Sequence, residues 1–259
     1  MPGLASAQSE PAVPGTRDIK DILASKVLRV AITHFDIPAF HWRGSNGFEG
    51  PEIDLVRQIG DHLGVAVEIN DDAQSFDAVI EAVANGSADI GLSKVSQDYY
   101  RFVKVRFSEP YIVLHQAMLY DRRFLARGAV TETPEDAVRH FSGRIGVIRG
   151  GAYMDFGARS FPRAWVQGAP NWDAAIAGLK AHDYDAIYRD EFEILRVLQV
   201  QPAMNVEYGA AVLTDQESLV SIAICDSCAK LNAFINYHIK QTNGMFDLQR
   251  LLSWRSDIH

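Results

Sequence analysis

Apolar residues in the first third of the chain follow two spacings, that of buried strands and that of amphipathic helices. Residues 27–32 and 65–69 are short apolar runs that predict strands. Between them a helix is expected to begin with Pro51 at its first position and to end at Gly64 as C-cap. Its apolar positions are spaced by three or four residues, at Ile53, Val56, Ile59 and Leu63.

A second helix is expected after Ser75, a good N-cap residue, and before the Asn-Gly pair at residues 85–86. Its apolar positions are Phe76, Val79, Ile80 and Val83. The strand predicted at residues 90–92 completes a β-α-β-α-β run. Such a run implies a parallel sheet with right-handed crossovers.

The second half of the chain repeats this pattern at an offset of 96 residues. Phe76, Asp77, Ile80, Val83 and Asp89 correspond to Trp172, Asp173, Ile176, Leu179 and Asp185. The strand at residues 27–32 has a counterpart at residues 144–148. We interpret this as two similar α/β lobes, with chance agreement of two generic helix-strand units as the alternative.

Two long strand-like segments, at residues 112–120 and 217–224, are expected to cross between the lobes. The segment at residues 229–254 then returns to the first lobe, which is therefore discontinuous. It is expected to contain a helix with apolar positions at Leu231, Phe234, Ile235 and Ile239. The expected division is a flexible tail at residues 1–17, a first lobe of residues 18–116 and 216–259, and a second lobe of residues 117–215.

A polar loop follows the predicted strand at residues 90–92 and ends in Arg101. Ligands of open α/β sheets collect beyond the carboxyl ends of the strands, so a small anion would meet Arg101 there. The alternative is a surface arginine that pairs with Asp98 about one helical turn earlier.

Composition excludes several classes of function. With 259 residues and a 47% apolar share, the chain can bury one large or two medium cores. Its formal net charge of −8 argues against general nucleic-acid binding, which needs clustered Lys and Arg. No run approaches the ~20 apolar residues of a membrane span.

The first sixteen residues are rich in Pro, Gly, Ala and Ser, a composition typical of disorder. Residues 4–7 resemble the small-residue end of a secretory signal, although the apolar core of such a signal is missing. We expect an exported, periplasmic or extracytoplasmic protein whose signal peptide has been removed. A plain flexible tail or cloning scar is the alternative.

Cys225 and Cys228 are the only cysteines, and their spacing fits a local disulfide or a redox pair. The structural interpretation is favoured because the flanking Trp or Pro of redox motifs is missing. Two cysteines cannot form a structural zinc site alone, and we expect no metal or cofactor. The histidines at positions 34, 41 and 115 are scattered, as packed or surface histidines are.

Several motifs occur in a fixed order: Pro-Ala-Phe at residues 38–40, Gly-Pro-Glu-Ile-Asp at 50–54, Arg101, and Phe-Ser-Glu-Pro-Tyr at 107–111. With them the chain, from about residue 18 to 254, resembles the family 3 solute-binding proteins, the periplasmic receptors of polar amino-acid ABC importers. The resemblance implies the type II periplasmic-binding-protein fold, α/β and two-lobed, with a discontinuous first lobe and two hinge crossings.

The resemblance also implies a site. In the family an arginine holds the α-carboxylate of an amino acid and an aspartate of the second lobe holds its ammonium; the matching positions are Arg101 and Asp190. Guanidinium-carboxylate pairing and a buried carboxylate suit these roles. Asp190 could instead only cap a helix that starts at Glu191. The aromatic walls around the ligand would be Phe40, Phe76 and Trp42, although Phe76 also fits a purely structural place in the core.

The chain departs from the family pattern at several of these positions. Lys94 stands where a small residue or glycine is usual, and Ser96 and Asp98 stand where threonines are usual. Gly150, Gly151 and Ala152 replace Gly-Thr-Thr, which removes hydroxyl donors but keeps backbone N–H groups at a helix start.

Charge at these positions bears on the ligand. Lys94, Arg101 and Arg149 would set three positive charges against Asp98 and Asp190, which matches a dicarboxylate or acidic amino acid. Alternatively, Lys94 neutralises Asp98 and the ligand is a neutral amino acid. The ligand expected here is therefore an amino acid or another small carboxylate.

The expected function is capture of this ligand between the lobes for delivery to an ABC permease in the membrane, by a monomer with no nucleic-acid partner and no turnover. An alternative is an enzyme like cyclohexadienyl dehydratase on the same fold, with Glu191, Glu193 or Lys94 as proton donor. Charged residues at a helix start are more typical of solvated caps. A third possibility is a ligand-sensing domain of a receptor or fused transporter.

Overall fold

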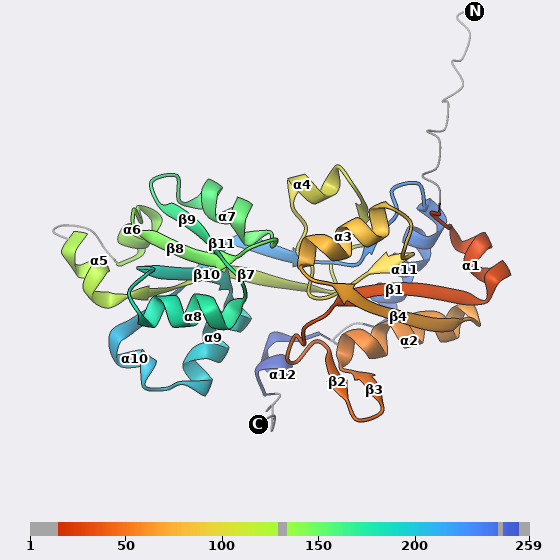
Figure 1. The fold of residues 1–259 in the computed structure, drawn as a ribbon, viewed down its shortest axis with the longest axis horizontal. Helices are drawn as coiled ribbons and strands as arrows, with labels where there is room; N and C mark the ends of the chain where they lie inside the picture. The colour runs from red at the N-terminus through yellow and green to blue at the C-terminus, as the bar shows by residue number, and fades with distance from the viewer. Residues whose placement is uncertain (1–14, 129–133, 243–245, 254–259) are drawn as a thin grey trace, which may run out of the picture.

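The computed structural model describes residues 15–128, 134–242 and 246–253, arranged as two α/β lobes that each contain a five-stranded sheet (Figure 1). The first sheet has the order β4 (Ala66–Ala73), β1 (Val27–Thr33), β5 (Ile90–Gly91), β12 (Ala223–Ile224), β6 (Arg106–Phe107). The second has the order β11 (Tyr208–Val220), β7 (Ile112–Asp121), β10 (Ala186–Asp190), β8 (Arg144–Ile148), β9 (Trp165–Ala169). The predicted fold class is confirmed.

The parallel run predicted for the first lobe is present. Strand β1 pairs in parallel with both β4 and β5, and the helices α2 (Pro51–Leu63) and α3 (Phe76–Ala84) make the connections. Helix α2 ends at Gly64, whose φ of 66° is the left-handed conformation that favours glycine. Helix α3 begins at Ser75, whose side chain accepts the N–H of Ala78.

Elements that lie 96 residues apart in the sequence have matching structures in the two lobes. Helix α8 (Trp172–Lys180) corresponds to α3, and its N-cap Asn171 corresponds to Ser75. Asp89 and Asp185 each precede a strand and accept the backbone N–H of an arginine on a neighbouring strand, Arg29 or Arg144, at 2.8 Å. The two lobes therefore share one local design, as the repeat predicted.

Two antiparallel strands, β7 and β11, run from one lobe into the other (Figure 1). Their register shifts between Leu213, which faces Gln116, and Glu217, which faces His115. The lobe boundaries predicted at residues 116/117 and 215/216 lie beside this irregularity. These boundaries stay a prediction.

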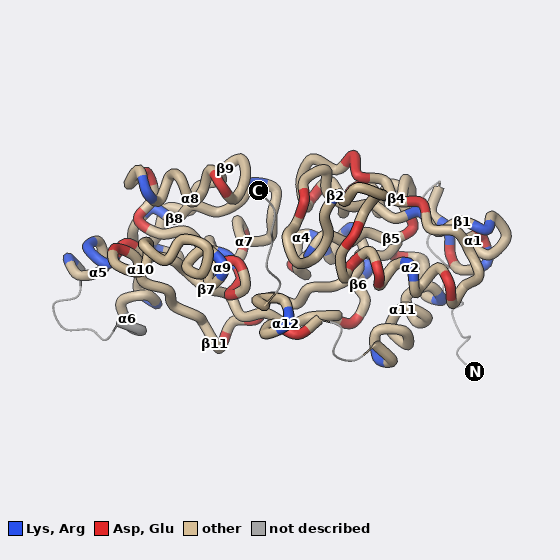
Figure 2. The backbone as a smooth tube through the Cα atoms, turned by 90° about the horizontal axis from the view of Figure 1, so that it is seen from below, with Lys and Arg blue, Asp and Glu red and all other residues tan. Residues whose placement is uncertain are grey.

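The C-terminal segment forms two helices, and the helix predicted from the apolar residues at 231–239 is the first of them. Helix α11 (Ala229–Gln241) packs on the first lobe, where Leu231 and Ile235 enter its core. Helix α12 (Leu248–Ser253) lies between the lobes and contacts α9 (Glu191–Val200) (Figure 2). The sequence after Thr242 is Asn-Gly, a turn-forming pair that does not favour continuing a helix.

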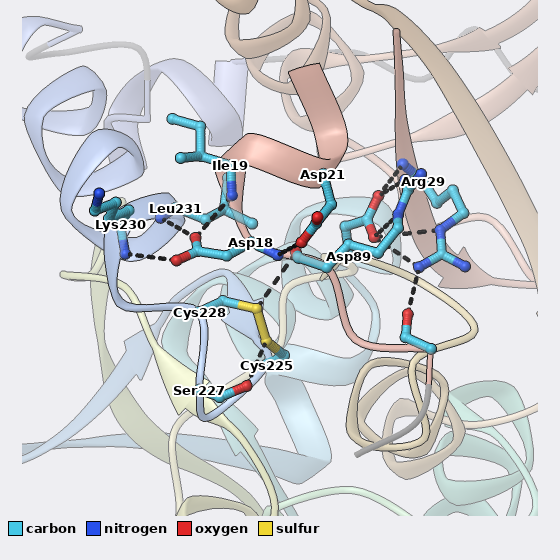
Figure 3. The surroundings of a disulfide bond; sticks show 12 residues. Asp18, Ile19, Asp21, Arg29, Asp89, Cys225, Ser227, Cys228, Lys230 and Leu231 are labelled. Carbon is cyan, nitrogen blue, oxygen red and sulfur yellow. Dashed lines mark hydrogen bonds and ion pairs between the residues drawn. A yellow bond between two sulfur atoms is a disulfide. The ribbon is translucent and has the colours of Figure 1, made fainter. Parts of the chain in front are cut away.

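The N-terminal helix α1 (Ile19–Ser25) has no counterpart among the predicted elements. Asp18 caps it and also accepts the backbone N–H of Leu231 at 2.8 Å, which ties α1 to α11 (Figure 3). The two cysteines form a buried local disulfide beside this junction (Figure 3). Arg17, placed by the sequence in the tail, binds Asp89, whereas residues 1–14 lie outside the described part.

The remaining elements are short. They are β2 (Trp42–Gly44), β3 (Gly47–Glu49), α4 (Tyr99–Phe102), α5 (Arg122–Gly128), α6 (Pro134–Arg139), α7 (Tyr153–Ser160) and α10 (Met204–Glu207). Among the helices described in the structure, none has both the length and the apolar character needed to cross a membrane.

Candidate ligand-binding site

A cavity of about 30 Å³ lies between the lobes, where loops after β5, β8 and β10 meet. The first lobe contributes Phe76, Lys94, Ser96 and Arg101; the second contributes Ile148, Gly151, Ala152, Tyr153, Tyr188, Arg189 and Asp190. A space of this size holds only one or two water molecules.

Arg101 is buried, with 1% of its surface exposed, so its interpretation as a surface arginine is wrong. The expected pairing with Asp98 is present, at 3.1 Å from Nε to Oδ2. Asp77 at the start of α3 accepts from Nε at 3.0 Å and from Nη2 at 2.8 Å. Nη1 donates to the carbonyl oxygen of Ser96 at 2.7 Å. These contacts hold the guanidinium plane in one orientation.

The same contacts leave part of the guanidinium available. A guanidinium has five N–H groups. The contacts that the structure describes occupy the N–H of Nε and one on each terminal nitrogen. One N–H remains on each of Nη1 and Nη2, a pair suited to a carboxylate. Burial raises the pKa of Asp98, and the nearby Arg101 offsets this rise in part.

Lys94 reaches across to the second lobe, so the expectation that it neutralises Asp98 is wrong. Its Nζ lies 2.8 Å from Oδ2 of Asp190 and 2.8 Å from Oε1 of Glu193. The side chain is 2% exposed, and Nζ lies 5.2 Å and 5.0 Å from the ring centroids of Phe40 and Phe192. Lys94 therefore forms a buried ion cluster between the lobes.

Asp190 has two roles in this cluster. Its Oδ1 caps α9 by accepting the N–H of Glu193 at 3.2 Å, as the alternative interpretation expected, and its Oδ2 binds Lys94. Glu191 and Glu193 are buried rather than solvated at this helix start. Burial acts to raise the pKa of Glu193, but Arg189 and Lys94 outweigh it and lower that pKa to about 2.

Of the three aromatic residues expected around the ligand, only Phe76 lines the small cavity. Phe40 is fully buried, packs edge-on against Phe192, and lies beneath Lys94. Trp42 lies in β2, beside a third hollow that also borders Gly50 and Arg250. Phe40 and Trp42 therefore do not form a wall at the arginine.

A larger cavity of about 530 Å³ adjoins the small one and shares Phe76, Ile148 and Arg189 with it. Its size is within the range of small-molecule pockets. Phe35 and Trp172, which were not expected at the site, also line it. The guanidinium of Arg189 lies 5.1 Å from the ring centroid of Trp172 and 5.8 Å from that of Phe76.

The glycine-rich turn brings the two lobes into contact. Gly150 has a φ of 69°, and its carbonyl oxygen accepts the N–H of Asp77 at 3.1 Å across the lobes. A Cβ at Gly150 would come to 3.0 Å from that of Ser75, so glycine permits this approach. Gly151 and Ala152 line the small cavity at the start of α7.

The charge balance differs from the expected one. Arg149 lines the larger cavity and binds the carbonyl oxygen of Gly168, while Arg189 takes a place at the small cavity. Four carboxylates contact three cations there: Asp77, Asp98, Asp190 and Glu193 against Lys94, Arg101 and Arg189. The expected excess of positive charge is therefore wrong, and the charges at the cavity do not favour an acidic ligand.

The chain is similar to known binding proteins. Residues 28–135 match the family model described as bacterial extracellular solute-binding proteins, family 3, while a search of curated proteins finds no match. Among solved structures, AbpA from Streptococcus pneumoniae bound to L-arginine has a TM-score of 0.70 at 21% identity, covering 90% of this chain and 95% of that one.

Two further structures show the same fold. The P235GK mutant of ArgBP from T. maritima has a TM-score of 0.68 at 21% identity, with 90% and 96% of the two chains covered. The ancestral amino acid-binding protein AncCDT-1, a precursor of cyclohexadienyl dehydratase, has a TM-score of 0.67 at 23% identity, with 90% and 96% covered. The resemblance to the family 3 solute-binding proteins is confirmed.

Proposed function

We propose that this protein is an extracytoplasmic solute-binding protein that captures an amino acid or related small carboxylate between its lobes and delivers it to an ABC importer. One observation carries the proposal: Arg101 of the first lobe and Asp190 of the second border a single cavity between the lobes. The AbpA structure bound to L-arginine supports a small-molecule ligand for this fold.

Arg101 is the anchor of the proposed site. Its remaining N–H groups, one on each terminal nitrogen, would hold a carboxylate by two parallel hydrogen bonds. Because both lobes line the cavity, the ligand enters when they separate. The register shift between β7 and β11 near Gln116 and Gln216 is where we place the hinge, at the expected lobe boundaries.

We propose binding without turnover. The dehydratase alternative needs a proton donor beside the ligand. Glu193, with a pKa of about 2, is ionised at neutral pH and cannot supply that proton. The test is to mix the protein with prephenate or arogenate and follow product by absorbance. Steady product formation well above the spontaneous rate would show that the protein is an enzyme.

The binding proposal is tested by Arg101→Ala and Arg101→Lys. A thermal-shift screen with amino acids, monocarboxylates and dicarboxylates identifies a ligand, because ligand at 100 times its Kd adds ~2.7 kcal/mol of stability. Calorimetric titration should then show a loss of ~2 to 5 kcal/mol for Arg101→Ala. Arg101→Lys should recover only part of it, because an ammonium lacks the planar fork.

The control is Arg123→Ala on α5, a side chain that is 59% exposed and pairs with Glu207 at 3.1 Å. It should bind ligand as the wild type does. Circular dichroism and thermal melting separate lost binding from lost folding, which matters because Arg101 also neutralises Asp77 and Asp98. Equal dissociation constants for wild type and both folded Arg101 variants would remove Arg101 from the site.

A further inference from the structure

Lys94 occupies the carboxylates that would otherwise receive an amino group of a ligand. We infer that the natural ligand is a carboxylic acid without an α-ammonium group, because the protein supplies that ammonium itself from Lys94. The inference rests on the proposed function, since it assumes that Arg101 and Asp190 border the ligand site. The proposed function allows an amino acid or another small carboxylate, and this inference leaves only carboxylates that lack the α-ammonium group.

The Lys94 ammonium is paired with two carboxylates and lies between two aromatic rings. Of its three N–H groups, two meet the carboxylates of Asp190 and Glu193 at 2.8 Å. The rings of Phe40 and Phe192 lie 5.2 Å and 5.0 Å from Nζ, within the range of cation–π attraction. An incoming ammonium would have to displace a cation that is already paired and tethered to the chain.

Displacement would also be electrostatically unfavourable. Arg189 lies 3.4 Å from Glu193 and 3.8 Å from Asp190, so two cations already balance these two carboxylates. A third cation would meet like charges in a buried place, and a displaced Lys94 would be left without its partners. At Arg101, in contrast, an N–H on each terminal nitrogen is still available for a carboxylate.

The backbone of Lys94 is fixed in position by the first lobe. Its N–H donates to Oε1 of the buried Glu52 at 2.6 Å, and Oε2 of Glu52 lies 2.7 Å from Nδ1 of His41. Ser93 and Lys94 have φ values of 110° and 51°, which are strained for residues other than glycine. Such strain persists where the surroundings over-determine the conformation, commonly at functional sites.

The first experiment compares matched pairs of compounds that differ only by the α-amino group. The pairs are L-phenylalanine and 3-phenylpropanoate, L-leucine and 4-methylpentanoate, and L-glutamate and glutarate, with thermal shift as the screen and calorimetric titration for affinity. For the wild type, at least one ammonium-free acid should bind at least tenfold more tightly than its amino-acid partner.

The second experiment removes the tethered ammonium. Lys94→Ala frees both carboxylates, and the charge-matched double variant Lys94→Ala with Glu193→Gln frees Asp190 alone, which guards against misfolding of the single variant. The amino acid of the preferred pair should gain at least tenfold in affinity relative to the wild type. Lys240→Ala, at an exposed position on α11 that pairs with Glu109, should leave both affinities unchanged.

The outcomes separate the inference from the proposed function. If the wild type binds an amino acid as tightly as its ammonium-free partner, the inference is overturned and the proposed function stands. A folded double variant that gains no affinity for amino acids also overturns it, because Lys94 would then not be what excludes the amine. If no compound of either class binds wild type or variants, the proposed function fails and the inference falls with it.

Discussion

Glu193 illustrates how a single buried carboxylate couples stability to pH. Its pKa in the folded protein is about 2, against 4.5 for a free glutamate, because Arg189 and Lys94 outweigh the effect of burial. A folded-state pKa that is lowered adds stability above the unfolded-state pKa. That stability is lost as the pH falls from about 4.5 towards 2.

We therefore expect Glu193→Gln to lower the free energy of unfolding at pH 7 by about 3 kcal/mol, the equivalent of a shift of this size. The difference from wild type should shrink steadily between pH 5 and pH 3 in denaturant titrations. Glu207→Gln, at a half-exposed carboxylate paired with Arg123, serves as the control and should change little. A cost for Glu193→Gln that stays constant across this pH range would contradict the ion cluster.

The same cluster shows what sequence can predict about single residues. Arg101, Asp190, Phe76 and Lys94 could all be named, because they stand at motif positions or at departures from the motif. The partner of Lys94 could not be predicted, because it lies 96 residues away on the other lobe. Asp77 was missed since an acidic residue in a first helical turn is commonplace.

Two aspartates that precede strands play the same part in the two lobes. Asp89 is buried and accepts hydrogen bonds from the side chains of Arg17 and Arg29. Asp185 is partly exposed and, among the residues that the structure describes, forms an ion pair with Arg144 alone, at 3.0 Å. Burial acts to raise the pKa of each carboxyl, but the arginine contacts outweigh it and both pKa values are lowered. The two lobes therefore use the same kind of contact, but Asp89 is more buried and binds one more arginine side chain than Asp185 does.

We expect Asp89→Asn to destabilise the protein by ~3 to 5 kcal/mol, because it removes one partner of a buried ion pair. Asp185→Asn should cost only ~1 to 3 kcal/mol, since water can replace part of what is lost. Denaturant unfolding at pH 7 measures both. Both costs should fall at pH 3, because the unfolded wild type takes up protons on these aspartates before the folded protein, in which their pKa values are lowered, does. An equal or larger cost for Asp185→Asn would show that burial does not set the difference.

At the scale of elements, strong periodicity with clear caps was sufficient for prediction. Helices α2 and α3 have apolar positions at regular spacing and recognisable ends, and both were predicted close to their observed bounds. Helix α1 was missed because its seven residues span only two turns, too short for the apolar positions Ile19, Ile22 and Leu23 to repeat. Helix α12 was not predicted, because it is six residues long and only its Leu251 is buried.

Two polar contacts join the lobes, in addition to the packing of Phe40 on Phe192 and of Arg189 on Phe76. One is the ion cluster of Lys94 with Asp190 and Glu193. The other is the backbone hydrogen bond from Asp77 to Gly150. The two-lobed fold followed from the internal repeat and the family resemblance. How the lobes meet depends on side chains far apart in the chain, which periodicity does not report.

The amide of Asp77 should therefore report closure of the two lobes. Its N–H donates to Gly150 of the other lobe at 3.1 Å, whereas the next amide along the chain, that of Ala78, donates to Ser75 of its own lobe at 3.1 Å. If closure requires Lys94, the Lys94→Ala variant should exchange the Asp77 amide at least tenfold faster, because each opening exposes it to water. A bound carboxylate should slow that exchange in the wild type.

The Ala78 amide should change little in either case, which makes it an internal control for hydrogen exchange followed by NMR. Equal changes at both amides would mean that helix α3 frays as a whole, and an Asp77 amide indifferent to ligand and to Lys94 would mean that the lobes do not open at this contact.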